Sequence, residues 1–111
     1  MRSFREFTEE LRKRGYSLKF DAVVKGKSGA SHRVDLLARR RTGKTVVGLE
    51  RRRGGDTTFE IIKTFTIAYD VGAEACYVVD RELEGEERRL AESYRISVWR
   101  NKPRNRLPRP P

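Results

Sequence analysis

The sequence RVDLLARRRTGKTVVGLERR, residues 33–52, contains two strand-like segments joined by a short turn. Apolar and polar side chains alternate in residues 33–40, where Val34, Leu36 and Ala38 fall on one predicted face. A second apolar segment follows in residues 45–52. Thr42-Gly43 lies between them and is typical of a tight turn. Strands this close in sequence pair readily, so we expect an antiparallel β-hairpin.

This predicted hairpin carries two carboxylates and a guanidinium. Asp35 lies on its first strand, and Glu50 and Arg52 lie on its second. Side chains in a strand repeat every two residues, so Glu50 and Arg52 are expected on the same face. The pairing can bring Asp35 beside that face, at the open end where the strands separate.

Paired carboxylates indicate two alternative roles for Asp35 and Glu50. They supply the oxygen ligands that a hard cation such as Mg²⁺ prefers. A cation bound there could polarise a phosphate and lower the pKa of a bound water, and a fixed positive charge nearby would stabilise the charge developing on phosphorus. The alternative is that both carboxylates pair with neighbouring arginines in a surface network.

Helical and strand periodicity predict the elements around the hairpin. We expect a helix over residues 4–14, a strand over 16–25, a second helix between Asp56 and Gly72, a buried strand over 75–79, a third helix over 84–94 and a short strand over 96–99. Ser3 and Glu6 have the spacing of a capping box. Ile61, Ile62, Phe65, Ala68 and Tyr69 form an apolar stripe expected to face the core. The order αβββαβαβ predicts an α/β domain over residues 1–100, in which helices flank a central mixed sheet.

Composition indicates a polyanionic partner. The 111 residues contain 26 Lys and Arg against 16 Asp and Glu, a formal net charge of +10. Charged residues make up 38% and hydrophobic residues 36%, so one small core is expected beneath a densely charged surface. DNA or RNA is the obvious partner of such a chain. The alternatives are an anionic membrane surface, for which no suitable amphipathic helix is visible, and thermophile-like ion-pair networks.

The basic residues are distributed unevenly. Clusters occur at residues 39–44 and 51–53, and a Pro/Arg-rich segment at 101–111 is expected to be a flexible tail. An acidic stretch at residues 80–92 suggests that a basic face is opposed by an acidic one. The residues expected to contact a DNA backbone are Lys27, His32, Arg33, Arg39, Arg40, Arg41, Lys44, Arg51 and Arg53.

Several classes of protein are excluded or disfavoured. No apolar run approaches the length that spans a bilayer, and no signal-peptide pattern opens the chain. Cys76 is the sole cysteine, which excludes an internal disulfide framework and a cysteine-rich zinc site. We therefore expect an intracellular, cytoplasmic protein.

The spacing from Asp35 to Glu50-Arg51-Arg52, on two strands between two helices, resembles the PD-(D/E)XK nuclease superfamily. This is the restriction-endonuclease-like fold, which includes archaeal Holliday-junction resolvases and methyl-directed restriction enzymes. Residues 26–38, Gly72-Ala73 and the segment 94–98 also look like the small archaeal members. The resemblance covers residues 3–99.

The resemblance implies phosphodiester cleavage that depends on Mg²⁺ or Mn²⁺, with Asp35 and Glu50 as metal ligands. The family's lysine falls at position 52, where this chain has Arg52, which stays charged and cannot act as a base. Lys63 on the second helix is a candidate for the missing ammonium. A glutamate of the first helix is a further metal ligand in some members, and Glu6, Glu9 and Glu10 are candidates.

We therefore expect a DNA-binding protein with a degenerate catalytic site, weak or no cleavage, and duplex or branched DNA as its partner. The family also suggests a homodimer. One alternative is an active Mg²⁺-dependent endodeoxyribonuclease that uses Asp35, Glu50 and either Arg52 or Lys63. The other is a small basic RNA-binding protein.

Overall fold

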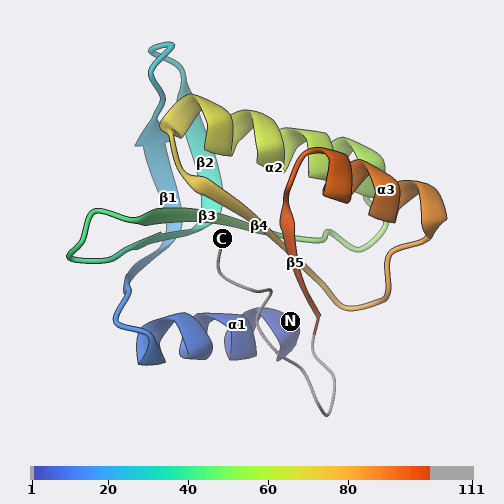
Figure 1. The fold of residues 1–111 in the computed structure, drawn as a ribbon, viewed down its shortest axis with the longest axis horizontal. Coiled ribbons are helices and arrows are strands. Elements are labelled where there is room, and N and C mark those ends of the chain that lie inside the picture. The colour runs from blue at the N-terminus through green and yellow to red at the C-terminus, as the bar shows by residue number, and fades with distance from the viewer. Residues whose placement is uncertain (1, 101–111) are drawn as a thin grey trace.

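The fold is a mixed β-sheet between two helical layers (Figure 1). The computed structural model describes residues 2–100, and the predicted tail at 101–111 lies outside the described residues. Within residues 2–100 the elements are α1 (Arg2–Lys13), β1 (Ser17–Lys25), β2 (Ser31–Arg39), β3 (Thr45–Glu50), α2 (Thr57–Val71), β4 (Glu74–Val79), α3 (Gly85–Ser93) and β5 (Ser97–Arg100). The predicted α/β class and the order αβββαβαβ are confirmed.

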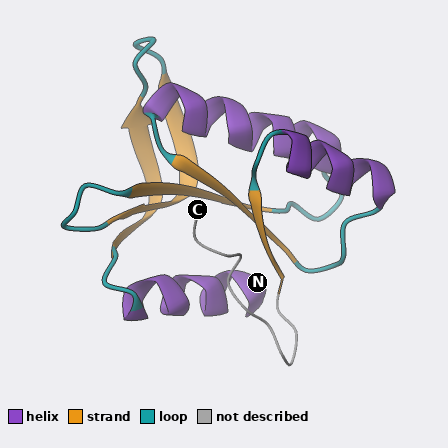
Figure 2. Cartoon of the chain, in the orientation of Figure 1, coloured by secondary structure: helices purple, strands orange, loops and turns teal. Residues whose placement is uncertain are grey.

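The strands are arranged in the order β1-β2-β3-β4-β5. β1, β2 and β3 pair antiparallel, whereas β3, β4 and β5 pair parallel. The parallel connections pass through α2 and α3, which lie on one face of the sheet, while α1 covers the other face (Figure 2). Within residues 2–100 no helix is long and apolar enough to cross a membrane.

Each face of the sheet buries its own core. Leu36, Val78 and Trp99 pack with Phe7 of α1. On the opposite face, Ile61 of α2 and Tyr77 of β4 are fully buried in the larger core. Because the sheet is covered on both faces, its central strands are apolar almost throughout, as a buried parallel sheet requires.

Gly48 at the centre of β3 lets α1 approach the sheet closely. A Cβ atom at this position would lie 3.3 Å from the Cβ of Leu36 and 3.4 Å from the Cε2 of Phe7. The first contact is tight and the second is an ordinary van der Waals contact, so the missing side chain leaves room for Phe7 of α1 to pack on β3. The glycine two residues before Glu50 therefore fixes how near α1 lies to the end of β3.

The predicted face of β2 is only partly correct. Leu36 and Ala38 lie in the core beneath α1, but Val34 packs in the core beneath α2. Asp21 of β1, near Asp35 of β2, has a left-handed φ of 48°. The turn that joins β1 and β2 reaches the end of α2, where the Lys27 N–H bonds to the carbonyl of Asp70 (Figure 1). Asp35 thus lies where β2 passes from one core to the other.

The predicted helix start is confirmed at α2 and wrong at α1. α2 is capped by Asp56, which accepts a hydrogen bond from the backbone N–H of Phe59, and it ends at Gly72 in the left-handed conformation. α1 begins at Arg2, so the prediction that Ser3 caps the helix from outside is wrong. Ser3 is buried, and its carbonyl accepts a hydrogen bond from Trp99 Nε1 at 3.1 Å.

The apolar stripe of α2 is partly exposed. Ile61 and Ala68 are buried as expected, but Ile62 is 38% exposed and Tyr69 76% exposed. The buried face of α2 passes instead through Thr64 and Ile67. Threonine at position 64 bonds its hydroxyl to a backbone carbonyl of the same helix, so it can be buried despite its polarity.

Asp70 of α2 fastens the β1–β2 turn to the helix. Its Oδ2 accepts hydrogen bonds from His32 Nε2 and from Ser28 Oγ, both at 2.7 Å, and its Oδ1 accepts one from the Ser28 N–H at 2.9 Å. A Cβ atom at Gly26 would collide with this carboxylate, so the turn requires glycine there. The bonds from His32 and then Ser28 lower the pKa of Asp70 from 3.8 to about 2.

The lowered pKa predicts a pH-dependent contribution of Asp70 to stability. The unfolded chain binds this proton more tightly than the native state does, so the contribution is complete above about pH 4 and is lost as the pH falls toward about 2. We expect Asp70→Asn to lower the melting temperature at pH 7, and the difference from the wild type to shrink over that acidic range. Asp21→Asn is the control, because the Asp21 side chain is 73% exposed. A difference that does not change with pH would contradict this assignment.

Candidate functional site

The candidate site is formed where β2 and β3 separate, and Asp35 connects the two strands there. Asp35 Oδ2 accepts a hydrogen bond from the backbone N–H of Glu50 at 2.8 Å. Asp35 Oδ1 accepts one from Arg52 Nη2 at 2.6 Å. The carboxylate therefore fixes both the end of β3 and the guanidinium that follows it.

Arg52 reaches this site from a turn rather than from a strand. β3 ends at Glu50, so the prediction that Glu50 and Arg52 share a strand face is wrong. The chain turns at residues 51–55, and Arg52 Nη1 comes within 3.6 Å of Glu50 Oε1. Its guanidinium thus lies between the two carboxylates. The sequence predicted that these three groups lie together, but it placed Arg52 on the strand rather than on a turn.

A second carboxylate holds the backbone of Arg52 in place. Glu60 of α2 accepts a hydrogen bond from the Arg52 N–H at 3.2 Å. The same oxygen of Glu60 accepts a hydrogen bond from the Tyr77 hydroxyl at 2.5 Å. Burial, and then the bond to Glu60, raise the pKa of Tyr77 above its usual value. The hydroxyl therefore stays a donor, and Glu60 has a fixed position from which to orient the turn.

The site is partly buried and negatively charged apart from Arg52. The side chains of Asp35 and Glu50 are 16% and 23% exposed, whereas that of Arg52 is 57% exposed. Burial, and then the charge of Asp35, raise the pKa of Glu50 above 4.5, while Arg52 opposes this rise. Arg52 supplies positive charge to both carboxylates, at 2.6 Å from Asp35 Oδ1 and 3.6 Å from Glu50 Oε1.

A divalent cation does not fit between these carboxylates while Arg52 is in place. Their oxygens are the donors that Mg²⁺ and Mn²⁺ prefer. Both oxygens of Asp35 are already bonded, one to Arg52 and the other to the Glu50 N–H. Across residues 2–100, no group of three or more His, Cys, Asp or Glu is arranged to hold a metal ion.

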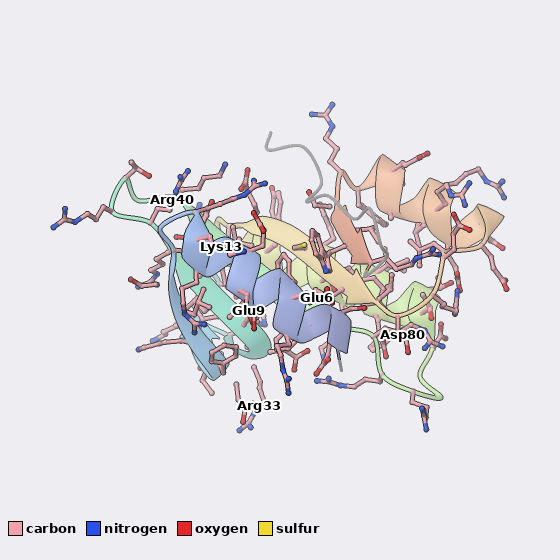
Figure 3. The ribbon with its side chains drawn as sticks, turned by 90° about the horizontal axis from the view of Figure 1, so that it is seen from below. Glu6, Glu9, Lys13, Arg33, Arg40 and Asp80 are labelled. Atoms are coloured by element: carbon pink, nitrogen blue, oxygen red, sulfur yellow. The ribbon has the colours of Figure 1, made fainter. Side chains whose placement is uncertain are left out.

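Among the other candidates, the α1 glutamates form no metal-holding group with Asp35 and Glu50 in the described part of the chain. Lys63 is exposed on α2, and neither a hydrogen bond nor an ion pair links it to Asp35 or Glu50. Of the α1 glutamates, Glu10 pairs with Arg14 at 3.5 Å. Figure 3 shows Glu6 and Glu9 along α1. Neither completes a three-residue metal group with Asp35 and Glu50.

Most of the predicted DNA-contacting residues near this site are engaged in the fold. His32 bonds to Asp70, and Arg33 pairs with Asp21 at 3.3 Å. Arg51 is turned away from the site, where its guanidinium lies 3.2 Å from Asp80. Lys27 and Arg53 are exposed and available.

The predicted cluster at residues 39–44 lies at the opposite end of the β2–β3 pair. Arg39 closes β2, and Arg40, Arg41 and Lys44 belong to the turn before β3. Four to five residues of extended strand separate this turn from Asp35 and Glu50, a distance of about 13–17 Å. The two basic clusters that adjoin one hairpin in sequence therefore occupy separate ends of it.

Glu60 and Tyr77 are the site residues that the sequence did not reveal. In the sequence, Tyr77 is one residue of an apolar, buried strand, and Glu60 is an acidic residue in the first turn of α2. The parallel pairing of β3 with β4 places Tyr77 opposite Leu49, next to the end of β3. No spacing in the sequence signals this contact, because it depends on how α2 crosses the sheet.

Comparison with known proteins shows the fold alone. No protein-family model and no curated protein match the chain. Among solved structures, the chain is similar to the crystal structure of AF1548, a protein of unknown function, with a TM-score of 0.66 and 17% sequence identity. The match covers 85% of this chain and 54% of that one, so the chain spans about half the length of AF1548.

The position of Arg52 between two carboxylates predicts how Glu50 titrates. We expect Arg52→Gln to raise the pKa of Glu50 further, because it removes the neutralising cation. Asp35→Asn should lower that pKa, because it removes the like charge. Carboxyl carbon chemical shifts measured by NMR against pH report both changes, with Arg53→Gln as the control. A Glu50 titration that neither substitution alters would show that the three groups do not converge.

Proposed function

We propose that the chain is a DNA-binding protein related to the PD-(D/E)XK nucleases, with a degenerate catalytic site that cleaves weakly or not at all. The observation that carries this proposal is the convergence of Asp35, Glu50 and Arg52. Hydrogen bonds of 2.8 and 2.6 Å and an ion pair of 3.6 Å join them at the ends of adjacent strands. These are the positions at which the resemblance places the family's two metal ligands and its lysine.

The degenerate character follows from the chemistry of Arg52. A lysine ammonium is compact and loses its proton when buried, so it can assist a water molecule. Arginine stays charged and forms a planar fork that matches a carboxylate or a phosphate. In this site the fork spans Asp35 and Glu50, so it takes the place of a cation between them.

DNA is the proposed ligand because a guanidinium here can exchange carboxylates for a phosphate. Arg52 is 57% exposed, and the neighbouring Arg53 adds exposed positive charge on the same turn, whereas Lys27 is exposed at the opposite end of α2. Contacts of this kind recognise the backbone without regard to sequence. The proposal also includes weak or no cleavage, dependence of any cleavage on Mg²⁺ or Mn²⁺, and the expected homodimer.

Cleavage of labelled linear, flapped and four-way DNA with Mg²⁺ or Mn²⁺ tests this function. We expect the wild type to bind DNA with little or no cleavage. Arg52→Lys should increase metal-dependent cleavage by about tenfold or more, because it frees both carboxylates and restores an ammonium. Asp35→Asn in the Arg52→Lys background should remove the gain.

Arg53→Lys is the matched control, since it makes the same change one residue away and should leave cleavage unaltered. Rapid cleavage by the wild type that Asp35→Asn abolishes would establish the active endonuclease instead. Tighter binding of RNA than of DNA of the same shape would favour the RNA-binding alternative. Failure to bind any nucleic acid would refute the proposal.

A further inference from the structure

Positive charge gathers at one end of the molecule, where α1 ends and β2 turns into β3. We name this surface the α1–turn patch. Its cations are Arg12, Lys13, Arg14, Arg39, Arg40, Arg41 and Lys44. Figure 3 shows Lys13 and Arg40 at this end, with Glu6 and Glu9 farther along α1. Only the turn residues of this set were expected from the sequence to contact a ligand.

The two segments of the patch are fixed to one another. Arg40 donates hydrogen bonds from Nε and Nη2 to the carbonyl of Arg14, at 3.1 and 2.9 Å. Its guanidinium also lies over the ring of Tyr16, 5.0 Å from the centroid. The end of α1 and the β2–β3 turn therefore form one surface whose shape is set by the fold.

The patch accounts for nearly all of the net charge of the described chain. It contains seven cations, with Glu10 and Glu74 as the carboxylates paired to it, so its formal charge is +5. The rest of residues 2–100 contains 15 Lys or Arg and 14 Asp or Glu. Charge over the rest of residues 2–100 is thus almost balanced, whereas charge at this end is not.

Structural roles account for only a part of this excess. Cations in the last turn of α1 favour the helix dipole, which is equivalent to about −0.5 charge and cannot neutralise the patch. Glu10 and Glu74 are paired with Arg14 and Lys44 at 3.5 and 3.3 Å. The remaining exposed cations have no carboxylate partner within residues 2–100: Arg12, Lys13, Arg39 and Arg41. A thermophile-like network would balance the two signs, whereas this surface has seven cations and two paired carboxylates.

We propose that the α1–turn patch is the main phosphate-binding surface of the protein. This patch is separate from the Asp35 site, and it binds the backbone of duplex DNA. This inference rests on the proposed DNA-binding function and gives it a location. The patch lies about 13–17 Å along the strands from Asp35 and Glu50. One strand of DNA has a phosphate about every 3.4 Å of helix axis, so about four or five base-pair steps connect the two places.

The test compares two variants that lose the same charge. The patch variant carries Arg12→Gln, Lys13→Gln, Arg39→Gln and Arg41→Gln. The control variant carries Arg5→Gln, Lys25→Gln, Arg89→Gln and Arg95→Gln, four exposed cations elsewhere. Fluorescence anisotropy measures the affinity for a labelled DNA duplex, and for an RNA duplex of the same sequence, between about 50 and 200 mM KCl.

We expect the patch variant to bind DNA about tenfold or more weakly and to lose about three units from the slope of log K against log salt concentration. The control variant should lose less than about threefold in affinity. Equal losses in the two variants would refute the patch while leaving DNA binding intact. No binding by the wild type would refute the proposed function itself. Tighter binding of RNA by the patch would refute the assignment to DNA. Circular dichroism confirms that both variants fold.

Discussion

The site depends on one carboxylate, that of Asp35, which bonds at once to the Glu50 N–H and to the Arg52 guanidinium. Paired strands leave backbone groups unpaired where they separate, and a side chain that accepts such an N–H fixes the end of the strand. Asp35 lies just beyond the point where the β2–β3 pairing ends, since Leu36 and Gly48 are the last paired residues. The same carboxylate then holds Arg52 against Glu50, so the architecture of the sheet and the charge balance of the site depend on a single group.

Two kinds of electrostatic surface coexist in this small domain. Around Asp35, charges of both signs are paired closely and partly buried. Burial and the charge of Asp35 raise the pKa of Glu50, and Arg52 opposes this rise as the neutralising cation. At the end of α1, unpaired cations are exposed, and this surface carries most of the net charge of residues 2–100. Paired, partly buried charges position groups for chemistry, whereas exposed charges of one sign attract polyanions over a longer range. In the proposed function, the α1–turn patch binds DNA, and the paired charges around Asp35 contact the DNA backbone.

The sequence predicted the fold better than the site. Element order, the capping of α2 by Asp56 and the stop at Gly72 follow from local rules, because periodicity and capping depend on neighbouring residues. The convergence of Asp35, Glu50 and Arg52 was predicted from strand spacing, but Arg52 arrives through a turn after β3 ends. Glu60 and Tyr77 were missed since their contact depends on how α2 crosses the sheet. Arg12 and Lys13 were missed because the contact of Arg40 with Arg14 spans 26 residues.

Anomalous diffraction from crystals soaked in Mn²⁺ tests the central claim most directly, namely that Arg52 takes the place of a cation between Asp35 and Glu50. Wild-type and Arg52→Lys crystals should be compared at neutral pH under identical conditions. The account predicts a manganese peak between the two carboxylates in Arg52→Lys crystals, and the guanidinium at that position in wild-type crystals. A manganese ion bound to both carboxylates beside an undisturbed Arg52, or carboxylates that point apart in both crystals, would contradict it.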